Sequence, residues 1–268
     1  MPTEPRPEPG APPRDAPGVD GLRQQFAVNQ QLVLRALFTV EECEDILRWV
    51  DFRDGRLRNC FGNPDAHPLL SRLNARLAEV FGREYTHIQT ALHYSSDSSP
   101  NTHNVHIDFP QRFFAYNPED NLQIWMLLRA SGLRADDEVL DLWTGFTPDG
   151  SKTFDRKDVP TLEKHPIKGL EVGDVLVFSS WLPHSSGAID HPYERYAFKV
   201  HYYSDCAVVD DAFVRQNRRV ALRVSGMSHN GTGPAMFAAE RSWGRWSRAL
   251  VRYPLAVYRS RQTPRKGY

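Results

Sequence analysis

The chain has 268 residues, and its 33 basic and 33 acidic side chains give a formal net charge of +0, so no global field points to nucleic acid as a partner. Its three cysteines (Cys43, Cys60 and Cys206) are too scattered for a disulfide framework, which fits a reducing cytoplasm. No apolar run is long enough for an integral membrane segment, and the length suits one β-barrel enzyme domain.

The N-terminal segment is rich in proline and has no apolar stretch that could join a core or form a secretory signal. We therefore expect residues 1–20 to be disordered, with a partner-binding proline motif as the alternative. A short edge strand is predicted at 31–35, and helices at about 40–50 and 68–81 follow it. Each helix carries apolar residues at helical spacing on one face, so both are expected to brace a sheet.

Local signals mark the ends of these two helices. Thr39 lies three residues before Glu42, which predicts a capping box at the start of the first helix. Pro68 suits the first turn of the second helix, and Gly82 is a plausible stop for it.

Several later segments have the composition of strands. Residues 85–94 and 195–203 alternate with a period of two, whereas 121–128 and 175–178 are almost continuously apolar. Residues 140–144 fit a further strand. The pattern predicts a mostly β chain with flanking helices.

The stretch at 104–110 carries the strongest chemical signal. His106 and Asp108 are two residues apart, so on a strand their side chains would leave the same face. An imidazole and a carboxylate side by side make two thirds of a facial metal triad, and His184 is the best candidate for the third ligand. Such triads leave coordination positions open and suit Fe(II). His-x-Asp alone is a weak signal that occurs by chance in many chains.

The later half of the chain makes this signal more specific. A Gly173-Asp174 turn leads into the apolar strand at 175–178, then to His184, and Arg195 follows eleven residues later. Together with the His-x-Asp pair, this ordered set resembles the Fe(II)/2-oxoglutarate-dependent dioxygenases, and within them the phytanoyl-CoA dioxygenase-like family. The resemblance covers roughly residues 30–205.

The resemblance implies a double-stranded β-helix, the jelly-roll or cupin-like fold. It places the dioxygenase domain and its N-terminal bracing helices at 21–206. Residues 207–268 fall outside it, and their aromatic and arginine content predicts a helical extension that packs on the barrel.

By the same resemblance, His106, Asp108 and His184 bind Fe(II) and are the catalytic residues. The remaining positions on the metal take the co-substrate 2-oxoglutarate and O2. The distal carboxylate of 2-oxoglutarate needs a fixed cation, and the resemblance assigns this role to Arg195. A surface ion pair of Arg195 with Glu194 or Asp190 is the alternative.

Further pocket residues follow from position. Ser186 and Trp125 match family positions beside the co-substrate, although Trp125 is one residue out of register. His201 shares a face with Arg195 and lies either near the pocket or in a polar core layer. Substrate contacts are predicted for residues that flank the metal stretch or the variable loop: His103, Phe109, Phe113 and Trp143.

Because Asp108 occupies the position that is small in related halogenases, hydroxylation, desaturation or alcohol oxidation is expected. The substrate is predicted to be a small metabolite, in a secondary-metabolite or antibiotic pathway. Residues 129–168 depart from the family pattern, so two alternatives stay open. One is a cupin-like metal enzyme that does not use 2-oxoglutarate, and the other is a catalytically silent binding protein on the same barrel.

Overall fold

A computed structural model describes residues 18–49, 58–59, 68–98, 104–108, 114–148, 154–210 and 212–213. The predictions of N-terminal disorder up to residue 17 and of a C-terminal helical extension beyond residue 213 lie outside these residues. Helix α1 begins at Val19, so the folded part starts two residues before the predicted boundary.

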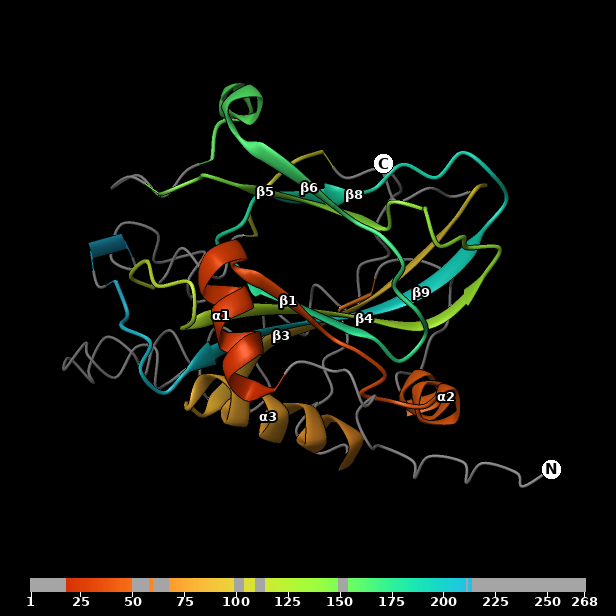
Figure 1. Ribbon diagram of the computed structural model, residues 1–268, viewed down its shortest axis with the longest axis horizontal. Coiled ribbons are helices and arrows are strands. Elements are labelled where there is room, and N and C mark those ends of the chain that lie inside the picture. Colours follow the sequence, from red (N-terminus) through yellow and green to blue (C-terminus); the bar gives the residue numbers. More distant parts are fainter. Residues whose placement is uncertain are drawn as a thin grey trace, which may run out of the picture.

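The described strands form two antiparallel sheets. The larger sheet contains β1 (Gln31–Leu34), β2 (Arg58–Asn59), β3 (Tyr85–Ser96), β4 (Asn121–Ser131), β7 (Val175–Ser179) and β9 (Glu194–Ser204), and the smaller one contains β5 (Leu140–Thr144), β6 (Glu163–Ile167) and β8 (His184–Ser186). Their orders are β1-β7-β4-β9-β3-β2 and β6-β5-β8. Figure 1 shows the smaller sheet lying over one face of the larger. The predicted fold class, a mostly β jelly roll with flanking helices, is confirmed.

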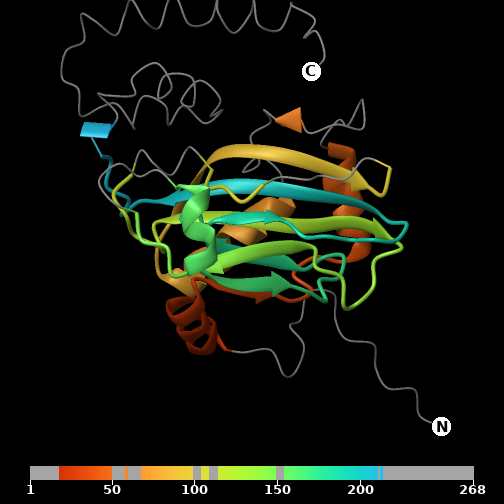
Figure 2. The same ribbon diagram turned by 90° about the horizontal axis from the view of Figure 1, so that it is seen from above.

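The described helices that flank the larger sheet are α1 (Val19–Asn29), α2 (Val40–Trp49) and α3 (Pro68–Phe81). Figure 1 shows α2 and α3 on the side away from the smaller sheet and α1 beside the edge strand β1, and Figure 2 shows the strands running side by side across the molecule. The predicted helices correspond to α2 and α3. Helix α1 was not predicted, because it buries only Leu22 and Phe26 and so has a short apolar stripe. A 3-10 helix, η3 (Arg156–Thr161), precedes β6.

The predicted helix ends are confirmed. The backbone N–H of Thr39 donates to the Glu42 carboxylate at 2.8 Å, and the N–H of Glu42 donates to Thr39 Oγ1 at 3.3 Å. These two bonds complete the capping box. Helix α3 ends at Gly82, which has φ +66° and donates its N–H to the Ala78 carbonyl.

Strand β4 separates two cores because its side chains alternate between the two faces of the sheet. The side chains that pack toward the helices are Leu122, Ile124, Met126 and Leu128. Trp125 and Leu127 face the smaller sheet and pack with Leu140, Leu142 and Phe178, among others. The second core forms the inner wall of the barrel, where the candidate site lies.

The Gly173-Asp174 turn ties β7 to the connection between β1 and α2. Gly173 has φ +97°, and a Cβ atom there would lie 2.0 Å from the Phe38 carbonyl oxygen, so only glycine fits. Asp174 accepts a hydrogen bond from the Ala36 N–H at 2.8 Å and pairs with Arg35 at 2.6 Å. The turn therefore fixes the start of the strand that leads to His184.

The described part of the metal stretch, residues 104–108, does not form a regular strand. His106 forms an isolated antiparallel bridge with His184, and Asp108 lies outside any strand. Within the described residues, no helix is long and apolar enough to cross a membrane.

Candidate metal centre

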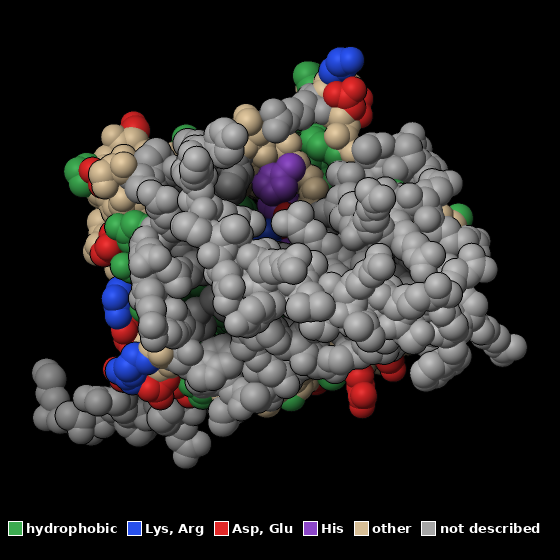
Figure 3. Space-filling model, turned by 180° about the vertical axis from the view of Figure 1, so that it is seen from behind, with side chains coloured by type: hydrophobic (Ala, Val, Ile, Leu, Met, Phe, Trp, Pro, Cys, Tyr) green, Lys and Arg blue, Asp and Glu red, His purple; other side chains and the backbone are tan. Residues whose placement is uncertain are grey.

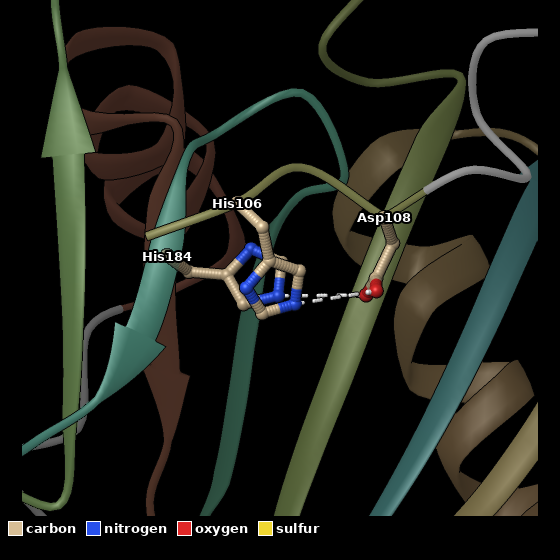
Figure 4. Close-up of side chains that lie close together, drawn as sticks. All are labelled: His106, Asp108 and His184. Carbon is tan, nitrogen blue, oxygen red and sulfur yellow. Dashed lines mark ion pairs between the residues drawn. The ribbon is translucent and has the colours of Figure 1, made fainter. Parts of the chain in front are cut away.

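Two backbone hydrogen bonds bring the separate parts of the site together. The N–H of His106 donates to the His184 carbonyl at 3.0 Å, and the N–H of His184 donates to the His106 carbonyl at 2.9 Å. The two imidazole rings lie 4.5 Å apart as a result. Asp108 follows in the same extended segment and faces both rings (Figure 4). The bridge thus achieves the arrangement that a regular strand was expected to produce.

The three side chains present one donor atom each to a common point. His106 Nε2 lies 3.6 Å from Asp108 Oδ1, and His184 Nε2 lies 3.4 Å from Asp108 Oδ2. The donor atoms of the three residues all lie within 4.8 Å of one another. His184 is buried, whereas the His106 side chain is 35% exposed. A histidine is visible from solvent in a recess of the surface in Figure 3.

Both triad histidines are held in the tautomer that a metal ligand needs. His106 Nδ1 lies 2.7 Å from the Asn104 carbonyl oxygen, and His184 Nδ1 lies 3.0 Å from the Leu182 carbonyl oxygen. Because a carbonyl oxygen only accepts, each Nδ1 carries the proton and each Nε2 presents its lone pair. Carbonyl partners of this kind orient metal-bound imidazoles in proteins. The residues present therefore fit a divalent metal ion.

Strand β9 adds two side chains that contact Asp108. Lys199 forms an ion pair with Asp108 Oδ2, and His201 Nε2 lies 3.2 Å from the same oxygen. Burial by itself would raise the pKa of Asp108, but the Lys199 charge and the nearby histidine rings hold that pKa well below its usual range. Asp108 is therefore an anion, as a metal ligand must be.

Arg195 lies further along the inner face of β9 and is only 4% exposed. Its Nε donates to Ser95 Oγ at 2.8 Å, and one terminal nitrogen donates to the Val139 carbonyl at 2.6 Å. Its guanidinium lies 5.7 Å from the centre of the Trp125 ring. Burial lowers the pKa of Arg195, but an arginine stays protonated in proteins. No described carboxylate forms an ion pair with it, so the surface pair with Glu194 or Asp190 is not formed.

No family model matches the chain, and no curated protein matches it. Solved structures do match. EctD from S. alaskensis superimposes with a TM-score of 0.55 and 18% identity over 75% of this chain and 82% of that one. The alpha-ketoglutarate-dependent epimerase SnoN from nogalamycin biosynthesis superimposes with a TM-score of 0.54 and 13% identity, over 71% of this chain and 85% of that one. The carbocyclase SnoK from the same biosynthesis superimposes with a TM-score of 0.52 and 13% identity, over 74% of this chain and 89% of that one.

The fold is that of the Fe/2-oxoglutarate-dependent enzymes. This agrees with the family resemblance of the sequence at the level of fold. Membership of the phytanoyl-CoA dioxygenase-like group stays a prediction. SnoN has also been crystallised in complex with Fe3+, alpha ketoglutarate and nogalamycin RO.

The inner face of β4 carries two buried amide side chains with polar atoms that lack partners among the described residues. Gln123 lies opposite His201 in the sheet, and its Nε2 is 3.4 Å from His184 Nε2. Gln123 Oε1 and both polar atoms of the Asn121 side chain have no hydrogen-bond partner in the described part of the chain, although each residue is only 1% exposed. Burying such groups unpaired is costly, and these amides are open to a bound molecule or water.

The remaining predicted residues divide into three groups. Ser186 lies on the same face of β8 as His184, and Trp125 lies beside Arg195, so both are on the barrel side. Trp143 projects from the opposite face of β5 to Leu142, the residue that pairs with His184, so the structure does not bring it to the triad. His103, Phe109 and Phe113 lie outside the described residues.

Lys199, Ser95 and the two amides were not identified from the sequence. Lys199 was detectable, because it lies in the same alternating row as Arg195 and His201. The predicted strand at 85–94 stops short of Ser95, whereas β3 continues through Ser96 and places the Ser95 hydroxyl against Arg195.

Proposed function

We propose that this chain is an Fe(II)- and 2-oxoglutarate-dependent oxygenase that oxidises a small metabolite. In this proposal His106, Asp108 and His184 are the metal ligands, and Arg195 binds the distal carboxylate of 2-oxoglutarate. The observation that carries it is the coexistence, in one barrel, of an oriented His-Asp-His triad and a buried arginine without a carboxylate partner. No carboxylate in the described part of the chain pairs with Arg195, so its buried charge is available to an anionic ligand.

The triad residues would present three donor atoms to one side of a bound metal ion. The coordination positions on its other side would stay free for further ligands. The two Nδ1–H groups fix the rings, and the ionised Asp108 supplies the negative charge. A bound iron ion would supply O2 activation, the chemistry for which this ligand set with open positions is suited. The protein contributes the orientation of the ligands.

Arg195 suits a carboxylate because part of its donor fork is still free. Ser95 and Val139 use Nε and one terminal nitrogen, which leaves the second terminal nitrogen unassigned. An anionic group would satisfy it and also compensate the buried charge. Trp125 packs beside the guanidinium, and Ser186 is proposed to add a hydroxyl to the same carboxylate.

The reaction is proposed to be hydroxylation, desaturation or alcohol oxidation. The matching structures include an epimerase and a carbocyclase from nogalamycin biosynthesis, so this fold accommodates several outcomes. Those two proteins support a role in antibiotic or other secondary-metabolite biosynthesis, with a small-molecule substrate. A cytoplasmic location is part of the same proposal.

Calorimetric titration of 2-oxoglutarate into the protein loaded with Mn(II) tests this function without knowledge of the substrate. We expect saturable binding that requires the metal and is lost in His184→Ala. His165→Ala is the matched control, because His165 contacts Thr144 outside the triad. Metal binding without 2-oxoglutarate binding would favour the cupin-like alternative, and absence of metal binding would favour the silent binding protein.

A further inference from the structure

Lys199 is a cation placed directly against the candidate metal ligand. Its ammonium group pairs with Asp108 Oδ2, and its side chain is only 12% exposed. The residue lies on the inner face of β9, opposite Trp125 of β4. Within the described residues it pairs with no other carboxylate. A lysine in this position is not needed to build the barrel wall, so its charge requires an explanation.

The charges of the site balance without a metal ion. The negative charge of Asp108 and the positive charge of Lys199 cancel each other. The imidazoles add no charge in the neutral form that binds metals. An unpaired carboxylate in this environment would be strongly unfavourable, because a buried charge needs a partner. The ion pair therefore makes the metal-free barrel stable.

A divalent ion changes this balance. It would add two positive charges within a few ångströms of the ammonium group, and it would need the same carboxylate. Like charges at such distances repel strongly in a partly buried site. Lys199 and the metal ion thus oppose each other at Asp108.

We propose that Lys199 is the resident counter-ion of Asp108, which stabilises the metal-free protein and weakens its affinity for the metal. The inference rests on the metal-site part of the proposed function. It assigns Lys199 as a positioning residue that acts through Asp108. It also predicts that loss of the lysine tightens metal binding, whereas a damaged site would bind metal more weakly.

His201 makes the proposal testable by substitution. Its Nε2 lies 3.2 Å from the same Asp108 oxygen, so it can hold the carboxylate when the lysine is absent. Lys199→Met then removes the charge, and Lys199→Gln removes the charge while keeping a hydrogen-bond donor. Lys164→Met is a matched control, since Lys164 also pairs with an aspartate, Asp141 at 3.1 Å, on β5.

The experiment measures the dissociation constant for Co(II) and the thermal midpoint of each variant. We expect Lys199→Met and Lys199→Gln to bind Co(II) about tenfold more tightly than the wild type, the scale on which neighbours of a ligand alter metal affinity. The gain should shrink when Asp108→Ala is added. Without metal, Lys199→Met should unfold at a lower temperature, and saturating Co(II) should restore its midpoint. Lys164→Met should bind Co(II) like the wild type.

Equal or weaker Co(II) binding by both Lys199 variants would overturn the proposal. Lys199 would then support metal binding by holding Asp108 in place, and would not oppose it. If Lys199→Met does not fold, Lys199→Gln decides alone, because it keeps the hydrogen bond. Failure of the proposed function looks different: the wild type would not bind Co(II), or His106→Ala and His184→Ala would bind it unchanged.

Discussion

The two faces of strand β4 differ in what they contribute. On the helix side its residues are apolar and at most 1% exposed: Leu122, Ile124, Met126 and Leu128. On the barrel side, Asn121 and Gln123 are equally buried but keep polar atoms without partners. The same strand thus supports an apolar core on one side and buried polar atoms without partners among the described residues on the other.

This difference shows where stability and function reside. The helix-side face gains free energy from buried apolar area. The barrel-side face gives up some of that gain to hold polar atoms without a partner among the described residues, which is typical of functional sites. Substitutions on the helix-side face should therefore lower the free energy of unfolding, whereas substitutions on the barrel-side face should change ligand binding more than stability.

The largest effect is expected for Asp108→Ala. The variant loses the anionic ligand and leaves the Lys199 ammonium unpaired beside the metal, so metal affinity should fall by more than about 100-fold, beyond the effect of second-sphere changes. Titration with Fe(II) under anaerobic conditions measures this. An unchanged affinity would remove Asp108 from the triad.

Arg195→Leu should act on the co-substrate and spare the metal. Hydrogen bonds to charged groups contribute about 1.5–3 kcal/mol each, so 2-oxoglutarate affinity should fall by about 10- to 100-fold or more. Arg195→Lys should retain part of the affinity, since it keeps the charge but not the planar fork. If 2-oxoglutarate binds equally well to all three proteins, Arg195 has only a structural role.

On the helix-side face, Ile124→Ala should lower the free energy of unfolding by about 2–5 kcal/mol, because it leaves a cavity in a fully buried core. The folded fraction should bind metal normally. Urea unfolding with and without metal checks both points. Weakened metal affinity in the folded protein would mean that the two faces are not independent.

On the barrel-side face, Asn121→Leu should leave stability unchanged or raise it by about 1 kcal/mol, because it removes two buried polar atoms that lack partners. Urea unfolding measures this as well. A loss of stability as large as that of Ile124→Ala would show that Asn121 is structurally satisfied.

A small pH effect is expected at the loop that supports Arg195. His191 Nε2 lies 2.7 Å from Asp137 Oδ1, and this hydrogen bond raises the pKa of His191. Because the pKa of His191 is higher in the folded than in the unfolded protein, its protonation stabilises the folded state. This contribution is fully present below pH 6.5, the ordinary pKa of histidine, and is lost as the pH rises through the folded pKa. The thermal midpoint of the wild type should therefore exceed that of His191→Gln more at about pH 5 than at about pH 8. The same difference at both values would contradict the assignment.

Much of the architecture could be predicted from local patterns. The period-two segments became β3 and β9, and the capping box opened α2 as expected. The spacing of His106, Asp108 and His184 also identified residues that meet in space, although an isolated bridge rather than a regular strand brings them together. The bridge between His106 and His184 forms only when the two sheets close, and no local pattern encodes that closure.

The parts that were missed depend on long-range packing. The Lys199–Asp108 pair spans 91 residues, and periodicity alone shows only that Lys199 shares a face with Arg195. Trp143 was assigned to the pocket from its neighbourhood in sequence, yet the register of β5 against β8 turns it away. Face and register, rather than proximity along the chain, decide which residues reach the site.

The most direct test of the account is the visible spectrum of the protein with Fe(II) and 2-oxoglutarate in the absence of oxygen. Chelation of 2-oxoglutarate to iron in the triad predicts a charge-transfer band that is missing in His106→Ala and in Arg195→Leu. Iron binding without such a band would contradict the assignment of 2-oxoglutarate as co-substrate. Absence of iron binding would contradict the triad itself.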